Sequence, residues 1–354
     1  MIKHIITLLL SIGFILGKEV SIVEVNVGKL IFNCRTSGLS NNGDGIILLH
    51  GWPETSHMWV DLMELLSDKG FRVVAPDQRG YSPQARPNNI NEYKIEKIVQ
   101  DVFSIADSFE FEQFHLIGHD WGASIGWAST YTKPERIITW TAMSVPHLSA
   151  FGQALQSDND QKKKSRYISF FKLPFIPEFY FSINDYKNLK KIWNKSSDEQ
   201  IDAYLQVFKG DGALKASLNW YRANIGSKSN NKKINDLGNI YTPSQLIWGN
   251  KDMALGRRGA EMTGKYMKGK YQFIELDAGH WLIQDDYSNV STSIVNIIEQ
   301  HAIKKQRNAF EMTPTKRFKQ EPRSSGFFLF AGLGVDLRHY TYNDLKEFDN
   351  IDEL

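Results

Sequence analysis

The sequence predicts an α/β protein whose central sheet is mostly parallel and covered by helices on both faces. Short apolar runs rich in branched and aromatic residues alternate with helical patterns, and most of the runs end at Gly, Pro or Asp. The runs are continuous rather than alternating, which is typical of parallel strands buried on both faces. They are GIILLHG (45–51), FRVVAPD (71–77), FHLIGH (114–119), IITWTAMSV (137–145), SQLIWGN (244–250) and YQFIELDAGH (271–280).

Two further strands and several helices complete the predicted core. SIVEVNVGKLIFNCRTSG looks like two strands joined near Gly28, and helical periodicity is found at 59–69, 95–109 and 125–131. The alternation stops between about His147 and Gly238, where the chain is rich in Lys, Asn and aromatic residues and is helical in pattern. We therefore expect a helical insertion after the sixth strand.

The domain organisation expected from these patterns has five parts. A signal peptide or anchor is followed by a core in two pieces with the helical cap between them, and the basic and polar chain after the core indicates a poorly ordered or peripheral tail. The boundaries are 1–17 for the signal, 18–147 and 239–303 for the core, 148–238 for the cap and 304–354 for the tail.

Composition is that of an ordinary globular protein. The chain has 354 residues, of which 42% are hydrophobic and 23% charged. The formal net charge of +2 gives no domain-wide basic field and argues against nucleic acid as a partner. The one cysteine, Cys34, excludes an intrachain disulfide framework.

Both ends of the chain carry short patterns that resemble targeting signals. A basic start with Lys3 precedes an apolar run from Ile5 to Leu16, which is too short to span a bilayer comfortably, and Gly17 is a candidate cleavage position. The final IDEL resembles signals for retention in the endoplasmic reticulum, and the sequons at Asn194 and Asn289 suit a lumenal chain. We therefore expect a glycoprotein of the secretory pathway, in the endoplasmic reticulum lumen or secreted, with an uncleaved signal-anchor as the alternative.

The stretch FHLIGHDWGAS (114–124) has the outline of a nucleophile elbow, a turn from strand to helix with small residues on both sides of the nucleophile. The usual nucleophile there is serine, whereas this chain has Asp120. A carboxylate is already ionised at neutral pH and can displace a leaving group from a saturated carbon, which gives an alkyl ester of the enzyme. The pattern therefore predicts Asp120 as a nucleophile towards saturated carbon.

Two further residues complete the order of nucleophile, acid and histidine that α/β-hydrolases have. Asp252 in WGNKDMAL and His280 in LDAGHWLIQ each follow a predicted strand, at the edge where parallel sheets place their sites. We expect His280 to activate water and Asp252 to orient the ring. Asp277 is the alternative acid, but an offset of three residues is short for reaching behind the imidazole.

The expected chemistry needs hydrogen-bond donors and a way to treat the leaving group. Hydrolysis of the ester builds an oxyanion, and we expect the backbone N–H groups of Trp121 and of Trp52 in HGWP to stabilise it. A halide leaving group needs only N–H donors, whereas an epoxide oxygen needs a proton donor with a pKa of about 10, the range of tyrosine. Tyr221 in SLNWYRANI and Tyr167 in KSRYISFFKLPFIPE are the candidates in the insertion.

Taken together, the motifs resemble the soluble type of α/β-hydrolase-fold epoxide hydrolase. The resemblance runs from LLHGWPE through APDQRGYSPQARP, HLIGHDWGAS, NWYR and AGHW, and covers roughly residues 25 to 300. It implies an α/β-hydrolase fold with an inserted helical cap and hydrolysis of epoxides to vicinal diols. It also implies Asp120, Asp252 and His280 as nucleophile, acid and base.

The resemblance also implies a pair of cap tyrosines that donate a proton to the epoxide oxygen, at Tyr221 and Tyr167. The segment YISFFKLPFIPE departs from the family at Lys172, where glutamine is common. PDQRGY, with Asp77 and Arg79, is similar to the family as well, and we interpret it as a structural loop without a chemical role.

Three alternatives to an epoxide hydrolase stay open. A haloalkane or haloacid dehalogenase shares Asp120, Trp121 and His280 and differs in how the cap treats the leaving group; a secreted ligand-binding homologue without turnover and a general esterase are the others. We expect an apolar epoxide, lipid-derived epoxides included, and water as partners, with no metal or organic cofactor. The sequence leaves membrane association and oligomeric state open. The basic run KKKSR (162–166) is interpreted as a solvated helix face rather than a site for an acidic substrate.

Overall fold

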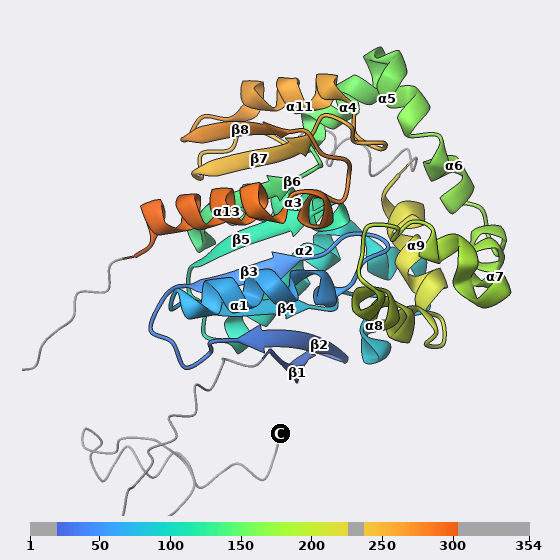
Figure 1. Cartoon of the computed structure of the whole chain (residues 1–354), viewed down its shortest axis with the longest axis horizontal. Helices are drawn as coiled ribbons and strands as arrows, with labels where there is room; N and C mark the ends of the chain where they lie inside the picture. The colour runs from blue at the N-terminus through green and yellow to red at the C-terminus, as the bar shows by residue number, and fades with distance from the viewer. Residues whose placement is uncertain (1–19, 226–236, 304–354) are drawn as a thin grey trace, which may run out of the picture. The chain divides into compact units, whose positions relative to one another are not determined.

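The computed structural model of the chain describes residues 20–225 and 237–303, and its centre is an eight-stranded sheet (Figure 1). The strands are β1 (Ser21–Val27), β2 (Leu30–Ser37), β3 (Gly45–Leu49), β4 (Arg72–Pro76), β5 (Phe114–His119), β6 (Ile137–Met143), β7 (Ser244–Gly249) and β8 (Tyr271–Leu276). Across the sheet their order is β1-β2-β4-β3-β5-β6-β7-β8. The pairs β1–β2 and β2–β4 are antiparallel, and the other five pairs are parallel.

The predicted fold class, an α/β-hydrolase fold with a mostly parallel sheet flanked by helices, is confirmed. Each of the eight predicted strands is present, and β3, β5 and β7 are buried along their whole length. Burial on both faces explains why these strands read as continuous apolar runs in the sequence. The edge strand β8 alternates more, with part of its side chains exposed.

Helices cover both faces of the sheet (Figure 1). The helices α1 and α13 lie on the face turned to the viewer, and α2 and α3 pack together on the opposite face. An ion pair of 2.9 Å between Lys69, at the end of α1, and Glu299 of α13 joins the first two helices. The helices outside the insertion are α1 (Val60–Asp68), α2 (Ile95–Ser108), α3 (Trp121–Thr132), α11 (Arg257–Met262), α12 (Leu282–Asp285) and α13 (Tyr287–His301).

One predicted helix begins earlier than its pattern indicates. Apolar periodicity starts at Ile125, but α3 begins at Trp121, directly after Asp120. The glycine at 122 weakens the sequence signal for a helix, whereas the backbone turns from β5 into α3 within the single residue Asp120. The elbow therefore has no connecting loop.

The predicted helical insertion lies between β6 and β7 and contains α4 (Leu148–Ser157), α5 (Asn159–Lys164), α6 (Tyr167–Phe171), α7 (Ile176–Lys190), α8 (Asp198–Phe208) and α9 (Ala213–Asn224). In Figure 1, α6 to α9 lie beyond the arrowheads of the parallel strands. The division into core and cap stays a prediction. Its segments 1–17, 226–236 and 304–354 lie outside the described residues.

The loop after β4 is fixed by a buried ion pair. Arg79 donates from Nε and Nη2 to the two carboxylate oxygens of Asp101 on α2, each at 2.7 Å, and both side chains are more than nine-tenths buried. The carbonyl of Arg79 accepts a hydrogen bond from the indole of Trp220 on α9 at 2.8 Å. Arg79 thus joins the sheet, α2 and the insertion, which agrees with the structural role expected for PDQRGY.

Replacing Asp101 by Ala is expected to lower the free energy of unfolding by about 3 kcal/mol, because the buried guanidinium of Arg79 then loses its two-point partner and keeps only the longer pair with Glu92 at 3.5 Å. Urea denaturation of the purified protein measures the change. Asp107→Ala is the matched control, since Asp107 is exposed in its 2.6 Å pair with Arg136 and its loss should cost about 1 kcal/mol or less. Equal losses for the two variants would contradict the structural role of the buried pair.

Candidate active site

Asp120 stands on a strained turn that only close backbone packing permits. Its φ of 51° and ψ of −118° lie outside the regions that residues with a side chain normally adopt. A Cβ at Gly122 would collide with the carbonyl of Leu49, and a Cβ at Gly51 would collide with the Asp120 side chain. Glycine at both positions therefore lets β3 and its loop approach the carboxylate.

The structure brings the three predicted residues of the triad together. The Nδ1 atom of His280 lies 2.9 Å from Oδ2 of Asp252, and its Nε2 atom lies 3.6 Å from Oδ2 of Asp120. All three residues are buried, with 7% of Asp120, 5% of His280 and 1% of Asp252 exposed. The other oxygen of Asp252 accepts hydrogen bonds from the N–H groups of Ala254 and Leu255.

Asp277, the alternative acid, lies elsewhere. Its side chain is exposed and pairs with Lys251 at 2.9 Å. Asp252 and not Asp277 therefore contacts the imidazole.

Charge in this buried site is shared between the ring and its two carboxylates. Burial disfavours the imidazolium, but the negative charges of Asp252 and Asp120 outweigh it and raise the pKa of His280 to about 10. Burial likewise disfavours the charge on Asp120, yet the His280 ring and the N–H of Trp52 hold the pKa of this carboxyl below its usual range. At neutral pH the site therefore contains an imidazolium between two carboxylates.

One of the two predicted oxyanion donors already contacts the carboxylate. The backbone N–H of Trp52 donates to Oδ1 of Asp120 at 2.9 Å. Trp121 is the first residue of α3, so its N–H is one of the donors that the first turn of a helix leaves free for a ligand.

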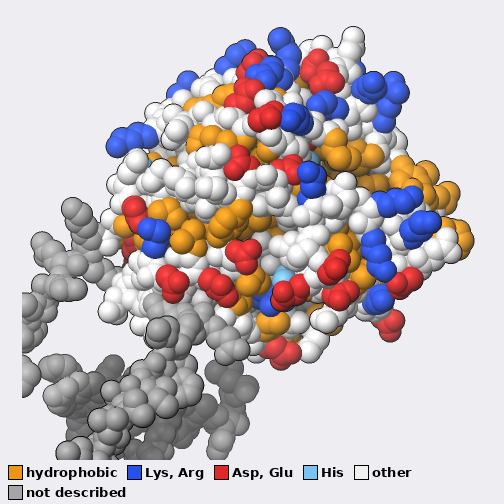
Figure 2. Space-filling model, viewed as in Figure 1, with side chains coloured by type: hydrophobic (Ala, Val, Ile, Leu, Met, Phe, Trp, Pro, Cys, Tyr) orange, Lys and Arg blue, Asp and Glu red, His pale blue; other side chains and the backbone are white. Residues whose placement is uncertain are grey.

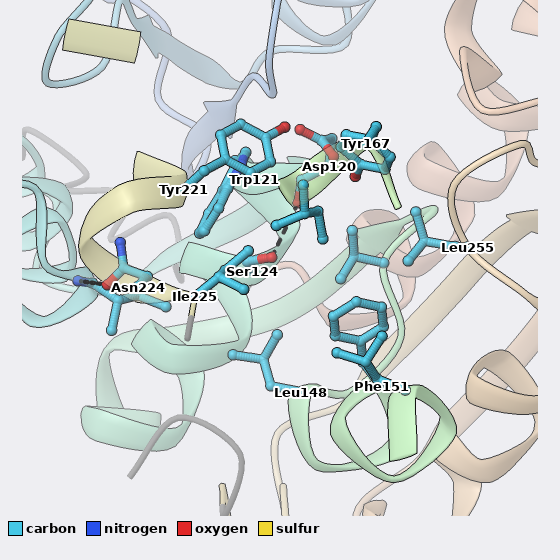
Figure 3. Close-up of a pocket in the computed structure, with 14 residues that line it drawn as sticks. Asp120, Trp121, Ser124, Leu148, Phe151, Tyr167, Tyr221, Asn224, Ile225 and Leu255 are labelled. Carbon is cyan, nitrogen blue, oxygen red and sulfur yellow. Dashed lines mark hydrogen bonds between the residues drawn. The ribbon is translucent and has the colours of Figure 1, made fainter. Parts of the chain in front are cut away.

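The two predicted tyrosines lie side by side next to Asp120. Tyr167 is the first residue of α6 and Tyr221 lies on α9, and their ring centroids are 6.2 Å apart. Figure 3 shows their hydroxyl groups pointing towards one another near Asp120. Burial and the charge of Asp120 raise the pKa of Tyr167, and burial raises that of Tyr221, so both hydroxyl groups are protonated at neutral pH.

Asp120, Tyr167 and Tyr221 together line two cavities. One, of about 240 Å³, is walled mainly by apolar side chains such as Leu148 and Phe151 (Figure 3). The other, of about 510 Å³, is lined by residues that include Trp52, Lys164, Met253, His280 and Trp281. A small apolar molecule can therefore contact the carboxylate and both hydroxyl groups at once.

A buried polar pair next to the triad was not predicted from the sequence. Glu54 and His119 are almost fully buried, with Oε2 of Glu54 3.2 Å from Nδ1 of His119. Gln284 donates to Glu54 at 2.6 Å, and Nε2 of His119 donates to the carbonyl of His280 at 2.9 Å. Glu54 directly follows HGWP and His119 directly precedes Asp120. At neither position does the sequence indicate whether the side chain is buried or exposed.

Gln161 of α5 was also missed. Its side chain is fully buried and uses its whole amide, donating to Ala254 O at 2.8 Å and Ser165 Oγ at 2.9 Å and accepting from Gly256 N–H at 2.7 Å. Gln161 thereby ties the segment that carries Tyr167 to the loop of Asp252. Lys164, in the basic run 162–166, donates to the carbonyl of Asp252 at 2.5 Å.

Comparisons with known proteins agree with this geometry. A family described as "alpha/beta hydrolase fold" matches residues 45–287. Epoxide hydrolase 4 of Homo sapiens is 35% identical over 273 residues, which are 73% of this chain and 74% of that protein. The AB hydrolase superfamily protein YfhM of Bacillus subtilis is 32% identical over 78% of this chain and 96% of its own length.

A solved structure supports the fold: the Bacillus megaterium epoxide hydrolase in complex with an inhibitor superposes with a TM-score of 0.71 at 23% identity, over 78% of this chain and all of that one. Sheet, elbow and buried triad define a hydrolase of the α/β-hydrolase fold. The chain belongs to the epoxide hydrolase family of that fold.

The predicted location in the secretory pathway, lumenal, secreted or held by a signal-anchor, is wrong. The relatives include a protein of Bacillus subtilis, and bacteria have no endoplasmic reticulum. Within residues 20–225 and 237–303, no helix has the length and apolar character that crossing a membrane requires. The comparisons give no support to the glycoprotein prediction from Asn194 and Asn289. Residues 1–17 and the final IDEL lie outside the described residues.

Titration of His280 tests the charge distribution of the site. NMR of the ring nitrogens should give a pKa of about 10 in the wild type. In Asp120→Asn and, more strongly, in Asp252→Asn the pKa should fall, because each change removes one carboxylate that stabilises the imidazolium. Because the folded-state pKa is raised, the stabilisation it gives is full below the ordinary value of 6.5 and is lost as the pH rises towards 10.

Asp277→Asn is the control for this titration, because Asp277 is exposed and pairs with Lys251 instead. It should leave the pKa of His280 unchanged. A wild-type value near 6.5, or an equal fall in the control, would contradict the shared-charge geometry.

Proposed function

We propose that the protein is an epoxide hydrolase that converts an epoxide to a vicinal diol through an alkyl ester of Asp120. The observation that carries this proposal is the pair of protonated tyrosines, Tyr167 and Tyr221, which line the same apolar cavity as the carboxylate. An epoxide oxygen leaves as a strong base and needs a proton, and two phenols beside the nucleophile supply what a halide would not need.

In the first half-reaction, a carboxylate oxygen of Asp120 attacks one carbon of the epoxide. The new C–O ester bond forms as the C–O bond of the ring breaks, and the released oxygen takes a proton from Tyr167 or Tyr221. The low pKa of Asp120 keeps the nucleophile ionised, and the hydroxyl groups of the tyrosines, whose pKa values burial raises, are protonated and can donate.

Ester formation prepares His280 for the second half-reaction. It removes the negative charge of Asp120, so the pKa of His280 falls and the imidazolium loses its proton, which balances the proton that the tyrosine gave up. The neutral ring, oriented by Asp252 at 2.9 Å, then takes a proton from water. The base is therefore generated only after the ester exists.

Water completes the cycle by attack on the ester. The hydroxide adds to the carboxyl carbon of Asp120, and the N–H groups of Trp52 and Trp121 stabilise the oxyanion. When this intermediate collapses, the carboxyl proton passes to the departing alkoxide, the diol leaves and the imidazolium is restored. No metal or organic cofactor enters these steps.

The arrangement of the insertion fits a cap over this chemistry. In our proposal the cap is 148–238 and the core is 18–147 with 239–303. The cap contributes both tyrosines and excludes water from the apolar cavity, so that the ester is opened only by the water that His280 activates.

The dehalogenase alternative is less well supported. A halide is stabilised by free indole N–H groups, but the indole of Trp52 donates to Ser217 Oγ at 3.2 Å and that of Trp121 interacts with the hydroxyl of Tyr221. The indole N–H of Trp52 is therefore already used within the protein.

Trapping of the ester tests the proposal directly. Purified His280→Gln, incubated with styrene oxide, should accumulate a peptide containing Asp120 with the mass of one added epoxide, because the ester forms and is not hydrolysed. Mass spectrometry measures the adduct, and the wild type should instead release the diol. Asp120→Ala is the control and should show neither product.

A 1-bromoalkane in place of the epoxide separates the alternatives. Bromide release with no diol from styrene oxide would identify a dehalogenase, and absence of any adduct would identify a binding protein without turnover.

The tyrosines should act on ring opening alone. Tyr221→Phe is expected to slow formation of the ester about 100-fold or more, and Tyr167→Phe combined with it should reduce the rate further, because no phenol then protonates the leaving oxygen. Rapid-quench detection of the adduct in the His280→Gln background measures this step. Tyr186→Phe, a cap tyrosine whose hydroxyl donates to Phe208 O, is the control. Ester formation at the wild-type rate in the double variant would refute the proton-donor role.

A further inference from the structure

A run of exposed apolar side chains lies at the start of α7. Of the twelve large hydrophobic residues that are exposed in the part of the chain the structure describes, five lie within 173–180. We name these five the α7 surface. Its members are Leu173 (41% exposed), Phe175 (79%), Ile176 (54%), Phe179 (69%) and Tyr180 (44%). A contiguous apolar surface of this kind marks an interaction site.

The backbone conformation of Phe175 and the contacts of Arg222 determine how the α7 surface is presented. Phe175 has a φ of 65°, a conformation that a bulky residue adopts only where its surroundings enforce it. Beneath it, Arg222 of α9 pairs with both carboxylate oxygens of Glu178 and donates to the carbonyl of Leu173 at 2.6 Å. A part-buried ion pair therefore holds the backbone of this segment against α9.

The chain segment that contains the α7 surface is strongly basic in sequence. Residues 162–195 contain nine Lys or Arg residues and two acidic residues, a net charge of +7, in a chain whose overall formal charge is +2. Both acidic residues are paired, Glu178 with Arg222 and Asp185 with Lys190 and Lys209. Of the nine basic residues, Lys164, Lys190 and Lys195 also have acidic partners. Figure 2 shows hydrophobic side chains at the right edge of the molecule, where α7 lies in Figure 1, with Lys and Arg beside them.

A cavity that reaches the site opens beside this surface. It has a volume of about 730 Å³, and its lining includes Tyr180 of the α7 surface, Lys191, Lys195 and Met253, and His280 of the triad. Met253 is itself 71% exposed. The α7 surface is therefore continuous with the cavity that reaches His280.

We propose that the α7 surface and the lysines around it bind the surface of an anionic phospholipid bilayer. Aromatic and aliphatic side chains bury in the boundary between headgroups and acyl chains, while lysines pair with anionic headgroups. A protein partner fits less well, because lysine is depleted at the centres of protein interfaces. A second copy would place two segments of charge +7 against each other.

Binding at a bilayer would also serve the proposed function. Apolar epoxides concentrate in membranes, and a cavity that opens at the bound surface would receive them without passage through water. This part rests on the proposed function, whereas bilayer binding does not, so the binding test uses no turnover.

Flotation of the full chain with lipid vesicles tests the proposal. The protein should float with vesicles of equimolar phosphatidylcholine and phosphatidylserine, less with phosphatidylcholine alone, and less as salt is raised. Phe175→Ser with Phe179→Ser should lower the partition coefficient about tenfold or more. Lys172→Glu with Lys191→Glu should lower it about fivefold per lysine, on the anionic vesicles only.

The controls distinguish the α7 surface from other exposed hydrophobic residues, and membrane binding from catalysis. Ile22→Ser with Tyr241→Ser changes two residues that are 56% and 69% exposed elsewhere and should leave flotation unchanged. The Phe175 and Phe179 double variant should keep wild-type turnover of a small water-soluble epoxide, since neither side chain lines a cavity of the site. Asp120→Ala should float like the wild type even if no epoxide is hydrolysed.

Three results would overturn the proposal. They are no flotation of the wild type, equal flotation of the Phe175 and Phe179 double variant, and light scattering that shows a wild-type dimer reduced to a monomer in that variant. The last result would assign the α7 surface to self-association.

Discussion

An imidazole held between two buried carboxylates is the interaction on which the rest of the site depends. Asp120 and Asp252 are both buried, and the ring of His280 lies between them, 3.6 Å from Oδ2 of Asp120 and 2.9 Å from Oδ2 of Asp252. The three side chains follow β5, β7 and β8, so the register of the parallel strands determines how closely they meet. Small changes in the sheet would therefore alter the charge of all three groups together.

Polar contacts outside the triad keep its members in place from two directions. From the sheet side, the carbonyl of His280 accepts hydrogen bonds from His119 and from the hydroxyl of Ser144, both at 2.9 Å. From the insertion, Gln161 binds the loop that follows Asp252. Gln161 lies six residues before Tyr167. The positions of Asp252 and Tyr167 therefore both depend on Gln161, and a shift of the insertion would displace both residues.

Most of the fold could be predicted because its signals are local. Continuous apolar runs identify strands covered on both faces, and two glycines around Asp120 indicate a turn without room for a side chain. The polar contacts that hold the triad in place could not be predicted, because they join residues far apart in the sequence. Gln161 binds a partner 93 residues further on, and Gln284 binds Glu54 across 230 residues. The compartment prediction failed for a different reason: it used short patterns at the chain ends that no contact in the described fold constrains.

The insertion has apolar side chains on two sides, one facing Asp120 and one facing outward at α7. On the side that faces Asp120 it buries Tyr167 and Tyr221, and this burial raises the pKa of both hydroxyl groups further above their ordinary value. Facing outward at α7, it is apolar as well, so hydrophobicity alone does not decide which side of this helix packs inward. The ion pair between Glu178 and Arg222 decides it, because only one orientation of α7 keeps that carboxylate against the guanidinium. Arg222 directly follows Tyr221, and the position of a tyrosine at the site and the exposure of the α7 surface therefore depend on the same turn of α9.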